Sequence, residues 1–188
     1  VLYWGQRPIP RCLLVPERIA FAIALSELRS SDEVLEIGCG RGVAANLIGA
    51  HLTTGSVTAI DRSEAAIAAA SLINEQAAAE GRVTILKLSF EELALVRGQF
   101  DRVVAVNVNR FWQAAADDRS VWRSILRVAA RMVLVFETPP GTSAVRERVG
   151  GTRYLEANGF SDIRLAQPTP EGRLVGLVAT WRGAAGGI

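Results

Sequence analysis

Short apolar runs recur along this chain, and most of them stop at a glycine or at a polar residue. The first three are followed by segments that start like helices, and a fifth run follows a segment, 117–130, with apolar residues at helical spacing. Strands that alternate with helices predict a mostly parallel sheet. The five predicted strands are 34–37, 57–60, 83–88, 100–106 and 132–136.

The two ends of the chain complete this prediction. Residues 16–28 indicate a helix that starts at a proline, and 146–157 indicate a helix that ends at Asn-Gly. Strands 163–166 and 174–181 follow with a short connection, so they must run antiparallel. The predicted fold class is α/β, with a doubly wound, mostly parallel seven-stranded sheet that finishes in a C-terminal antiparallel hairpin.

A loop with three glycines follows the strand at 34–37. Gly38, Gly40 and Gly42 allow a sharp turn and a close approach to a ligand, and a helix start follows them. Their spacing differs from the G-x-G-x-x-G of dinucleotide sites, because the third glycine comes one residue early. Glu36 would repel a pyrophosphate, whereas it suits a ligand with an amino group and a positive sulfur.

The run E-x-G-C-G-x-G at 36–42 resembles motif I of the class I S-adenosylmethionine (SAM)-dependent methyltransferases. The resemblance covers residues 32–182, with 1–31 as an N-terminal segment and helix and 183–188 as a tail. It implies a Rossmann-like methyltransferase fold and SAM as the cofactor, bound at the carboxyl ends of the strands. The motif I residues expected at the cofactor are Glu36, Gly38, Cys39 and Gly40.

Asp61 ends the second strand, where it is expected to accept hydrogen bonds from the ribose hydroxyls. The alternative is that Asp61 only begins the turn before a helix led by Ser63 and Glu64. Arg62 next to it is compatible with a 2′-phosphate and hence NADP. We discount NADP, because arginine is the common cation of this chain, and Arg62 stays among the residues expected at the SAM site.

Two further strand ends supply the rest of the expected cofactor site. The resemblance places Ser89, Phe90 and Glu91 at the adenine, where a polar group meets the amino group and an apolar side chain covers the ring. Ser89 also has the position of a helix cap, with Glu92 completing a capping box. Asn107 matches the polar residue that closes motif IV, near the methionine part of SAM.

The acceptor site is less specified. Asn109, Phe111 and Trp112 follow the fourth strand, and Trp4 lies in the N-terminal segment, so these four are expected to wall a substrate pocket. Aromatic residues are nevertheless more often part of a core. We also expect residues 1–15 to fold over the bound cofactor, because methyl transfer requires the sulfonium to be shielded from water.

Methyl transfer needs mainly alignment, because the sulfonium is already activated and its thioether leaves without a proton. A base is required only if the acceptor is a hydroxyl or a protonated nitrogen. The candidates for that base are Glu137, Tyr3 and Tyr154.

Composition narrows the function further. The 188 residues suffice for one domain, and no apolar stretch reaches the roughly 18 to 20 residues that span a bilayer. Two separated cysteines and one histidine give no metal spacing, so we expect a cytoplasmic protein whose activity needs no metal. The 21 basic and 19 acidic residues are scattered, which disfavours nucleic acid as a partner.

The resulting hypothesis is a SAM-dependent methyltransferase with a small-molecule acceptor and an undetermined oligomeric state. A noncatalytic SAM-binding or partner-regulating domain remains an alternative. An NAD(P)-dependent oxidoreductase is a weaker one, because Lys87 is the only lysine and no Tyr-x-x-x-Lys pair exists.

Overall fold

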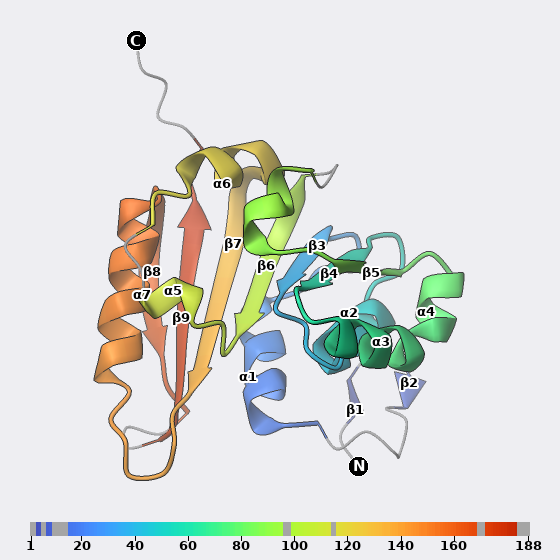
Figure 1. The fold of residues 1–188 in the computed structure, drawn as a ribbon, viewed down its shortest axis with the longest axis horizontal. Helices are drawn as coiled ribbons and strands as arrows, with labels where there is room; N and C mark the ends of the chain where they lie inside the picture. Colours follow the sequence, from blue (N-terminus) through green and yellow to red (C-terminus); the bar gives the residue numbers. More distant parts are fainter. Residues whose placement is uncertain are drawn as a thin grey trace.

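The computed structural model describes residues 15–95, 99–113, 116–168 and 172–183, together with the backbone of 3–4 and 7–8. Its centre is a seven-stranded sheet with the order β5-β4-β3-β6-β7-β9-β8 (Figure 1). The strands in that order are β5 (Val83–Lys87), β4 (Val57–Asp61), β3 (Val34–Ile37), β6 (Phe100–Val106), β7 (Leu126–Glu137), β9 (Leu174–Trp181) and β8 (Phe160–Ala166).

The direction of the strands confirms the predicted fold class. Pairs β5·β4, β4·β3, β3·β6 and β6·β7 are parallel, whereas β9 runs antiparallel to both of its neighbours. The C-terminal hairpin is therefore β8 and β9, as predicted. The backbones of β1 (Tyr3–Trp4) and β2 (Arg7–Pro8) pair separately from this sheet.

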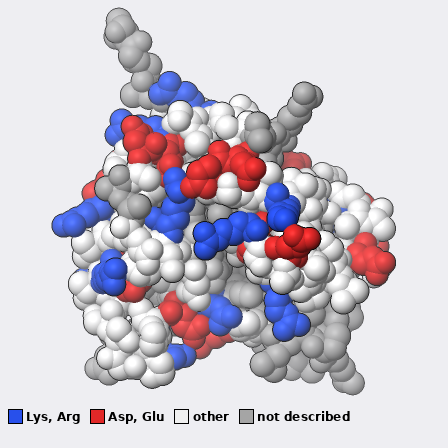
Figure 2. Space-filling view, viewed as in Figure 1, with Lys and Arg blue, Asp and Glu red and all other residues white. Residues whose placement is uncertain are grey.

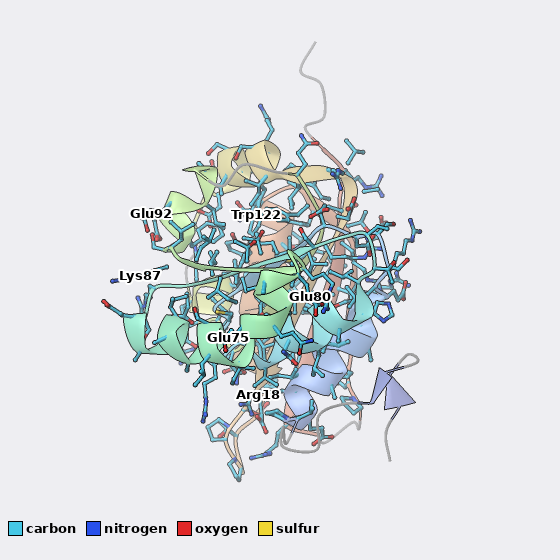
Figure 3. All side chains as sticks on the ribbon, turned by 90° about the vertical axis from the view of Figure 1, so that its right-hand side faces the viewer. Arg18, Glu75, Glu80, Lys87, Glu92 and Trp122 are labelled. Atoms are coloured by element: carbon cyan, nitrogen blue, oxygen red, sulfur yellow. The ribbon has the colours of Figure 1, made fainter. Side chains whose placement is uncertain are left out.

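Helices cover both faces of the sheet and close two apolar cores. One core joins the sheet to α1 (Glu17–Ser26), α2 (Val43–His51), α3 (Glu64–Ile73) and α4 (Glu75–Ala79). The other joins it to the 3₁₀ helix η1 (Phe90–Leu95) and to α5 (Arg110–Gln113), α6 (Arg119–Ile125) and α7 (Val145–Ala157). In Figure 3 the labelled Trp122 of α6 lies among the side chains of this second core.

Alternation along the central strands explains why both cores form. Val104 of β6 and Val133 of β7 belong to the core beneath α1 and α2, while Val103 and Met132 belong to the opposite core. Successive side chains of a strand point to opposite faces, so a strand that is apolar throughout is buried on both sides. None of the described helices is long and apolar enough to cross a membrane.

Local signals located most helices correctly, with one clear error. Ser63 caps α3 by accepting a hydrogen bond from the Ala66 amide at 3.3 Å, and Gly159 ends α7 with φ +84°. The predicted helix 117–130 instead stops at Ile125, and 126–130 belong to β7. Leu126 pairs with Phe100 of β6, a long-range contact that overrides the local helical spacing.

The register of the parallel strands places four chain turns at one edge of the sheet. Ile37 at the end of β3 pairs with Ile60 of β4 and with Ala105 of β6, and Asp61 pairs with Lys87 at the end of β5. The carboxyl ends of β3, β4, β5 and β6 therefore meet. In doubly wound folds, ligands bind at this edge.

Candidate cofactor site

The turn from β3 into α2 requires its glycines. Gly38, Gly40 and Gly42 have φ of +72°, +53° and +76°, a region that favours glycine. A Cβ on Gly42 would lie 2.6 Å from Nδ2 of Asn74 and 2.8 Å from Cβ of Ala70. Glycine at 42 thus lets α2 begin directly against α3.

The amides of this loop are used mostly within the protein. Gly38 and Cys39 donate to the Ile60 carbonyl at 2.9 and 3.0 Å, and Gly40 donates to Oδ2 of Asp61 at 3.0 Å. The Gly42 amide donates to the Cys39 carbonyl at 2.9 Å. A bound pyrophosphate needs free amides at such a turn. The loop therefore suits a ligand that carries no phosphate at this point.

A cleft of about 570 Å³ runs along the carboxyl ends of β4, β5 and β6, beside the glycine loop. Its polar and apolar walls come from different strand ends, as in small-molecule sites generally. Of the residues expected at the cofactor, those that line the cleft are Gly38, Asp61, Arg62, Ser89, Phe90, Glu91 and Asn107. Asn109, expected at the acceptor, lines it as well.

Asp61 has the turn role that its sequence position allowed, and it also lines the cleft. Its Oδ1 accepts from the Ser63 amide at 2.9 Å and its Oδ2 accepts from the Gly40 amide, so it orders the turn and the loop. Each carboxylate oxygen has two acceptor positions. The side chain therefore keeps acceptor capacity toward the cleft that it lines.

Glu36 of β3 and Cys39 of the loop are buried and are not among the residues that line the cleft. Oε2 of Glu36 is buried and has no hydrogen-bond partner. Burial raises the pKa of Glu36 to about 8; the Ala45 amide opposes this rise and the charge of Asp61 adds to it. A buried, unpartnered carboxyl group fits a cationic ligand.

The Cys39 thiol gives no sign of reactivity. Burial, together with the charges of Glu36 and Asp61, raises the pKa of Cys39 to about 12. The thiol therefore remains protonated at neutral pH. Cys39 contributes to the loop through its backbone amide, which donates to the Ile60 carbonyl, and its expected place at the cofactor stays a prediction.

The segment after β5 supports the capping interpretation. Both the amide and the hydroxyl of Ser89 donate to Oε2 of Glu92, at 2.8 and 2.9 Å. Phe90 is only 8% exposed and packs edge-to-face against Phe111 and Trp122. Its ring therefore belongs mainly to the core, and only a small part of it reaches the cleft.

Arg110 lines the cleft as well, which its place in the sequence did not predict. Its guanidinium lies 4.2 Å from the centre of the Phe90 ring, donates to Asp118 at 2.7 and 3.2 Å, and pairs with Glu91 at 2.6 Å. The Arg110 guanidinium thus covers one face of the Phe90 ring and presents a planar cation to the cleft. The sequence signal for Arg110 was its position shortly after the strand, between Asn109 and the aromatic pair Phe111 and Trp112.

Two of the aromatic residues expected in the acceptor pocket, Phe111 and Trp112, do not line the cleft. Phe111 is fully buried in the core with Trp122, because α5 packs against α7 at that point. Trp112 is half-buried under the Arg146 guanidinium of α7, 4.8 Å from its ring centre. The side chain of Trp4 lies outside the described residues.

The structure describes the side chains of two of the three candidate bases, Tyr154 and Glu137. Tyr154 is 1% exposed, donates to Asp118 at 2.7 Å and accepts from Nε1 of Trp122 at 3.1 Å. Burial and the adjacent Asp118 carboxylate raise the pKa of Tyr154, and Tyr154 does not line the cleft. Glu137 is held between two arginines, and the side chain of Tyr3 lies outside the described residues.

Within the described part of the chain, no group of three or more metal-ligating side chains converges.

Asn107 at the end of β6 has φ +57° and accepts a hydrogen bond from the Glu137 amide through Oδ1 at 2.8 Å. This contact orients a polar residue of the cleft from the neighbouring strand.

The model of the methyltransferase domain family matches residues 34–131. An uncharacterised protein of Synechococcus sp. is 30% identical over 94 residues, which is 50% of this chain. The chain spans 22% of the length of that relative.

Solved structures share the fold at low sequence identity. A SAM-dependent O-methyltransferase from Thermotoga maritima has a TM-score of 0.71 and 15% identity, covering 93% of this chain and 68% of its own. A precorrin-6y C5,15-methyltransferase from Geobacter metallireducens has a TM-score of 0.68 and 14% identity, covering 93% and 94%. A fibrillarin pre-rRNA processing protein from Methanococcus jannaschii has a TM-score of 0.64 and 13% identity, covering 82% and 68%.

Proposed function

The chain belongs to the methyltransferase domain family, and from this premise we propose that it transfers the methyl group of SAM to an acceptor by in-line displacement. The observation that carries the proposal is the cleft at the carboxyl edge, where the glycine loop, Asp61 and the segment after β5 come together. SAM is the cofactor of the class I family that the chain resembles.

The residues at this edge fit SAM. The unpartnered carboxyl group of Glu36 suits the ammonium of the methionine part, with Gly38 and Asn107 beside it. Asp61 retains acceptor capacity for the ribose hydroxyls. Ser89, Glu91 and the exposed edge of Phe90 would hold the adenine, with Arg110 and Arg62 at the wall of the cleft.

SAM supplies, when bound, a methyl group activated on a sulfonium. The chain's own residues have to orient the two reactants and exclude water, and orientation alone contributes about 7 to 11 kcal/mol. The positive φ of Gly38 lets the backbone approach the reacting centre, and Leu88, Val106 and Val108 give the cleft apolar walls. No acid is needed for the leaving thioether.

We propose a small organic acceptor. Basic and acidic side chains are interspersed on the face shown in Figure 2, without the continuous basic stripe that a nucleic-acid backbone favours. A cytoplasmic setting is likewise a proposal, supported by the scarcity of cysteine.

Isothermal titration calorimetry with SAM, S-adenosylhomocysteine, NAD and NADP tests the cofactor assignment. We expect low-to-mid micromolar affinity or better for SAM or its demethylated product, and none for the dinucleotides. Binding of a dinucleotide without binding of SAM would overturn the proposal.

A methyl-transfer assay over a panel of acceptors, with and without EDTA, then tests catalysis. We expect turnover that is unchanged by the chelator. Tight SAM binding without turnover of any acceptor would favour the noncatalytic alternative.

A further inference from the structure

Glu137, the last residue of β7, is held between two arginines at the carboxyl edge of the sheet. Nη1 of Arg18 lies 2.9 Å from its Oε2, and Nη2 of Arg173 lies 2.9 Å from its Oε1. Arg18 comes from the first turn of α1, at the lower end of the molecule in Figure 3, and Arg173 directly precedes β9. Three separate segments thus converge on one point.

The backbone around this cluster is well anchored. The carbonyl of Arg173 accepts hydrogen bonds from the amide and the hydroxyl of Thr138, at 3.0 and 3.4 Å. Thr138 is buried, and α1 packs against β6 and β7. Both guanidinium groups are therefore supported by ordered backbone rather than by free loops.

The cluster carries excess positive charge. Two guanidinium groups face one carboxylate, and within the described residues neither arginine has a second carboxylate partner. The side chains of Arg18 and Arg173 are 37% and 48% exposed. Since a guanidinium has five N–H donors in a planar fork, both retain donors that a ligand can reach.

The cluster adjoins the cofactor cleft. The amide of Glu137 donates to Oδ1 of Asn107 at 2.8 Å, and Asn107 lines the cleft. Neighbouring strands lie about 4.8 Å apart, so the base of the cluster is one strand away from the cleft wall. An acceptor positioned for methyl transfer near Asn107 can extend across the end of β7 to these arginines.

Resting on the proposed function, we propose that Arg18 and Arg173 bind an anionic group of the methyl acceptor, a carboxylate or a phosphate. Planar guanidinium groups pair with such groups through two parallel hydrogen bonds, which fixes orientation as well as charge. Glu137 pairs with both arginines and competes with the ligand for them. The acceptor is then an anionic small molecule whose methylated atom lies at some distance from its charge.

Simple anions can test the proposal without knowledge of the acceptor, and the competition by Glu137 supplies a variant that should bind them more tightly. Protein saturated with S-adenosylhomocysteine is titrated with benzoate, phenyl phosphate or benzamide, and the arginine Nε–H resonances are followed by NMR. The resonances of Arg18 and Arg173 are assigned by their loss in R18Q and R173Q. R18K and R173K retain the charge, and R123Q of the exposed residue on α6 is the matched control.

We expect benzoate or phenyl phosphate to shift the Arg18 and Arg173 resonances, and benzamide not to shift them. The dissociation constant should rise at least fivefold in R18Q and R173Q, rise less in the lysine variants, and stay unchanged in R123Q. It should fall at least threefold in E137Q, because the competing carboxylate is gone. The anion that binds more tightly identifies the charged group of the acceptor.

Equal binding by wild type and R173Q, equal shifts with benzamide, or no gain in E137Q would overturn the proposal and leave a purely structural ion pair. Calorimetry with S-adenosylhomocysteine on the same variants separates this failure from failure of the methyltransferase assignment. Unchanged cofactor affinity shows that each variant is folded, whereas no binding by wild type contradicts the proposed function itself.

Discussion

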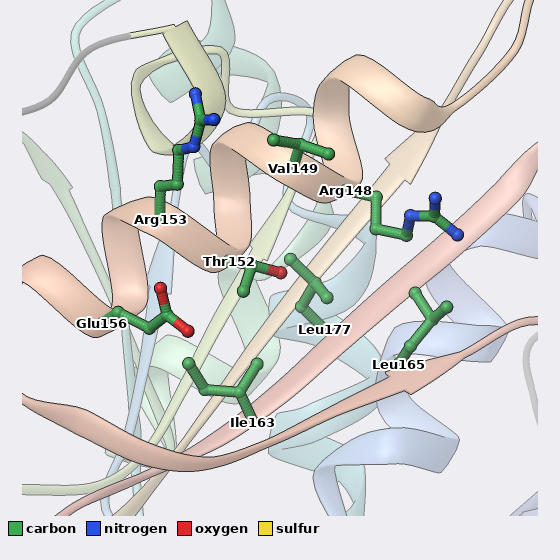
Figure 4. Close-up of a pocket in the computed structure, with 8 residues that line it drawn as sticks. All are labelled: Arg148, Val149, Thr152, Arg153, Glu156, Ile163, Leu165 and Leu177. Carbon is green, nitrogen blue, oxygen red and sulfur yellow. The ribbon is translucent and has the colours of Figure 1, made fainter.

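Two hollows of comparable size differ in how their walls are assembled. The cleft of about 570 Å³ draws on the ends of β3, β4, β5 and β6, whereas a groove of about 430 Å³ lies between α7 and the hairpin of β8 and β9. In the groove, Val149, Ile163, Leu165 and Leu177 form an apolar surface. Figure 4 shows the side chains of Arg148 and Arg153 pointing away from one another at its two sides.

This difference explains why only one hollow has the features of a site. The groove comes from one helix face and one hairpin, so its polar groups diverge with the helix surface. The cleft is formed at the ends of four parallel strands. Their register brings polar residues from separate segments to the same edge of the sheet. Positive φ angles in the glycine loop and an unpartnered buried carboxyl group accompany the cleft.

The largest expected effect concerns the glycine loop. Gly42→Ala should lower the free energy of unfolding by about 2 to 4 kcal/mol, because left-handed strain adds to overpacking against Asn74 and Ala70. Gly81→Ala is the matched control: φ is +73° there but a Cβ meets nothing within 4 Å, so we expect about 1 kcal/mol. Urea denaturation measures both, and equal losses would remove the packing argument.

The next prediction concerns SAM affinity after removal of a carboxylate from the cleft or from the groove. Asp61→Ala should weaken SAM binding by about 1.5 to 3 kcal/mol, the usual scale for hydrogen bonds to a charged group. That corresponds to roughly 10- to 150-fold in dissociation constant. Glu156→Ala in the groove should leave it unchanged. Calorimetry decides, and unaltered affinity in folded Asp61→Ala would reduce Asp61 to a turn residue.

A smaller effect is the pH dependence that Glu36 introduces. Its pKa is raised from 4.5 to about 8 in the folded protein, so the folded state binds more protons in this range. The free energy of unfolding should therefore fall as pH rises from about 4.5 to about 8. Each pKa unit corresponds to about 1.4 kcal/mol, and we expect at least that difference between pH 5.5 and pH 8.

Glu36→Gln should remove this part of the pH dependence, while Glu156→Gln should retain it. Chemical denaturation at the two pH values measures the change. A wild type and a Glu36→Gln variant with parallel pH profiles would show that the Glu36 carboxyl group ionises normally in the folded state.

The smallest effect is expected in the groove itself. Leu165 is 45% exposed, so Leu165→Asp should change the free energy of unfolding by less than about 0.5 kcal/mol. SAM affinity should not change either. A measurable loss of SAM binding would show that the groove and the cleft are coupled, which contradicts their separation.

Patterns within a few residues of one another predicted the cleft well. The glycines at 38, 40 and 42, Asp61, and the segment 89–91 lie at or beside it because each directly follows a buried strand, and strand ends in a parallel sheet share one edge. The predicted helix 117–130 failed for the opposite reason. Its apolar spacing is local, whereas the pairing of Leu126 with Phe100 is not.

The sequence by itself determined the seven strands of a doubly wound, mostly parallel sheet, the antiparallel hairpin at its end, the turn that needs glycine, and the edge at which polar residues gather. Only the tertiary structure decided which way each side chain at that edge points. Phe111 and Tyr154 lie in the core, and Arg110 lines the cleft. Glu137 forms ion pairs with two arginines from distant segments. The reason is physical: backbone periodicity is encoded locally, whereas burial and ion pairing depend on neighbours brought together by folding.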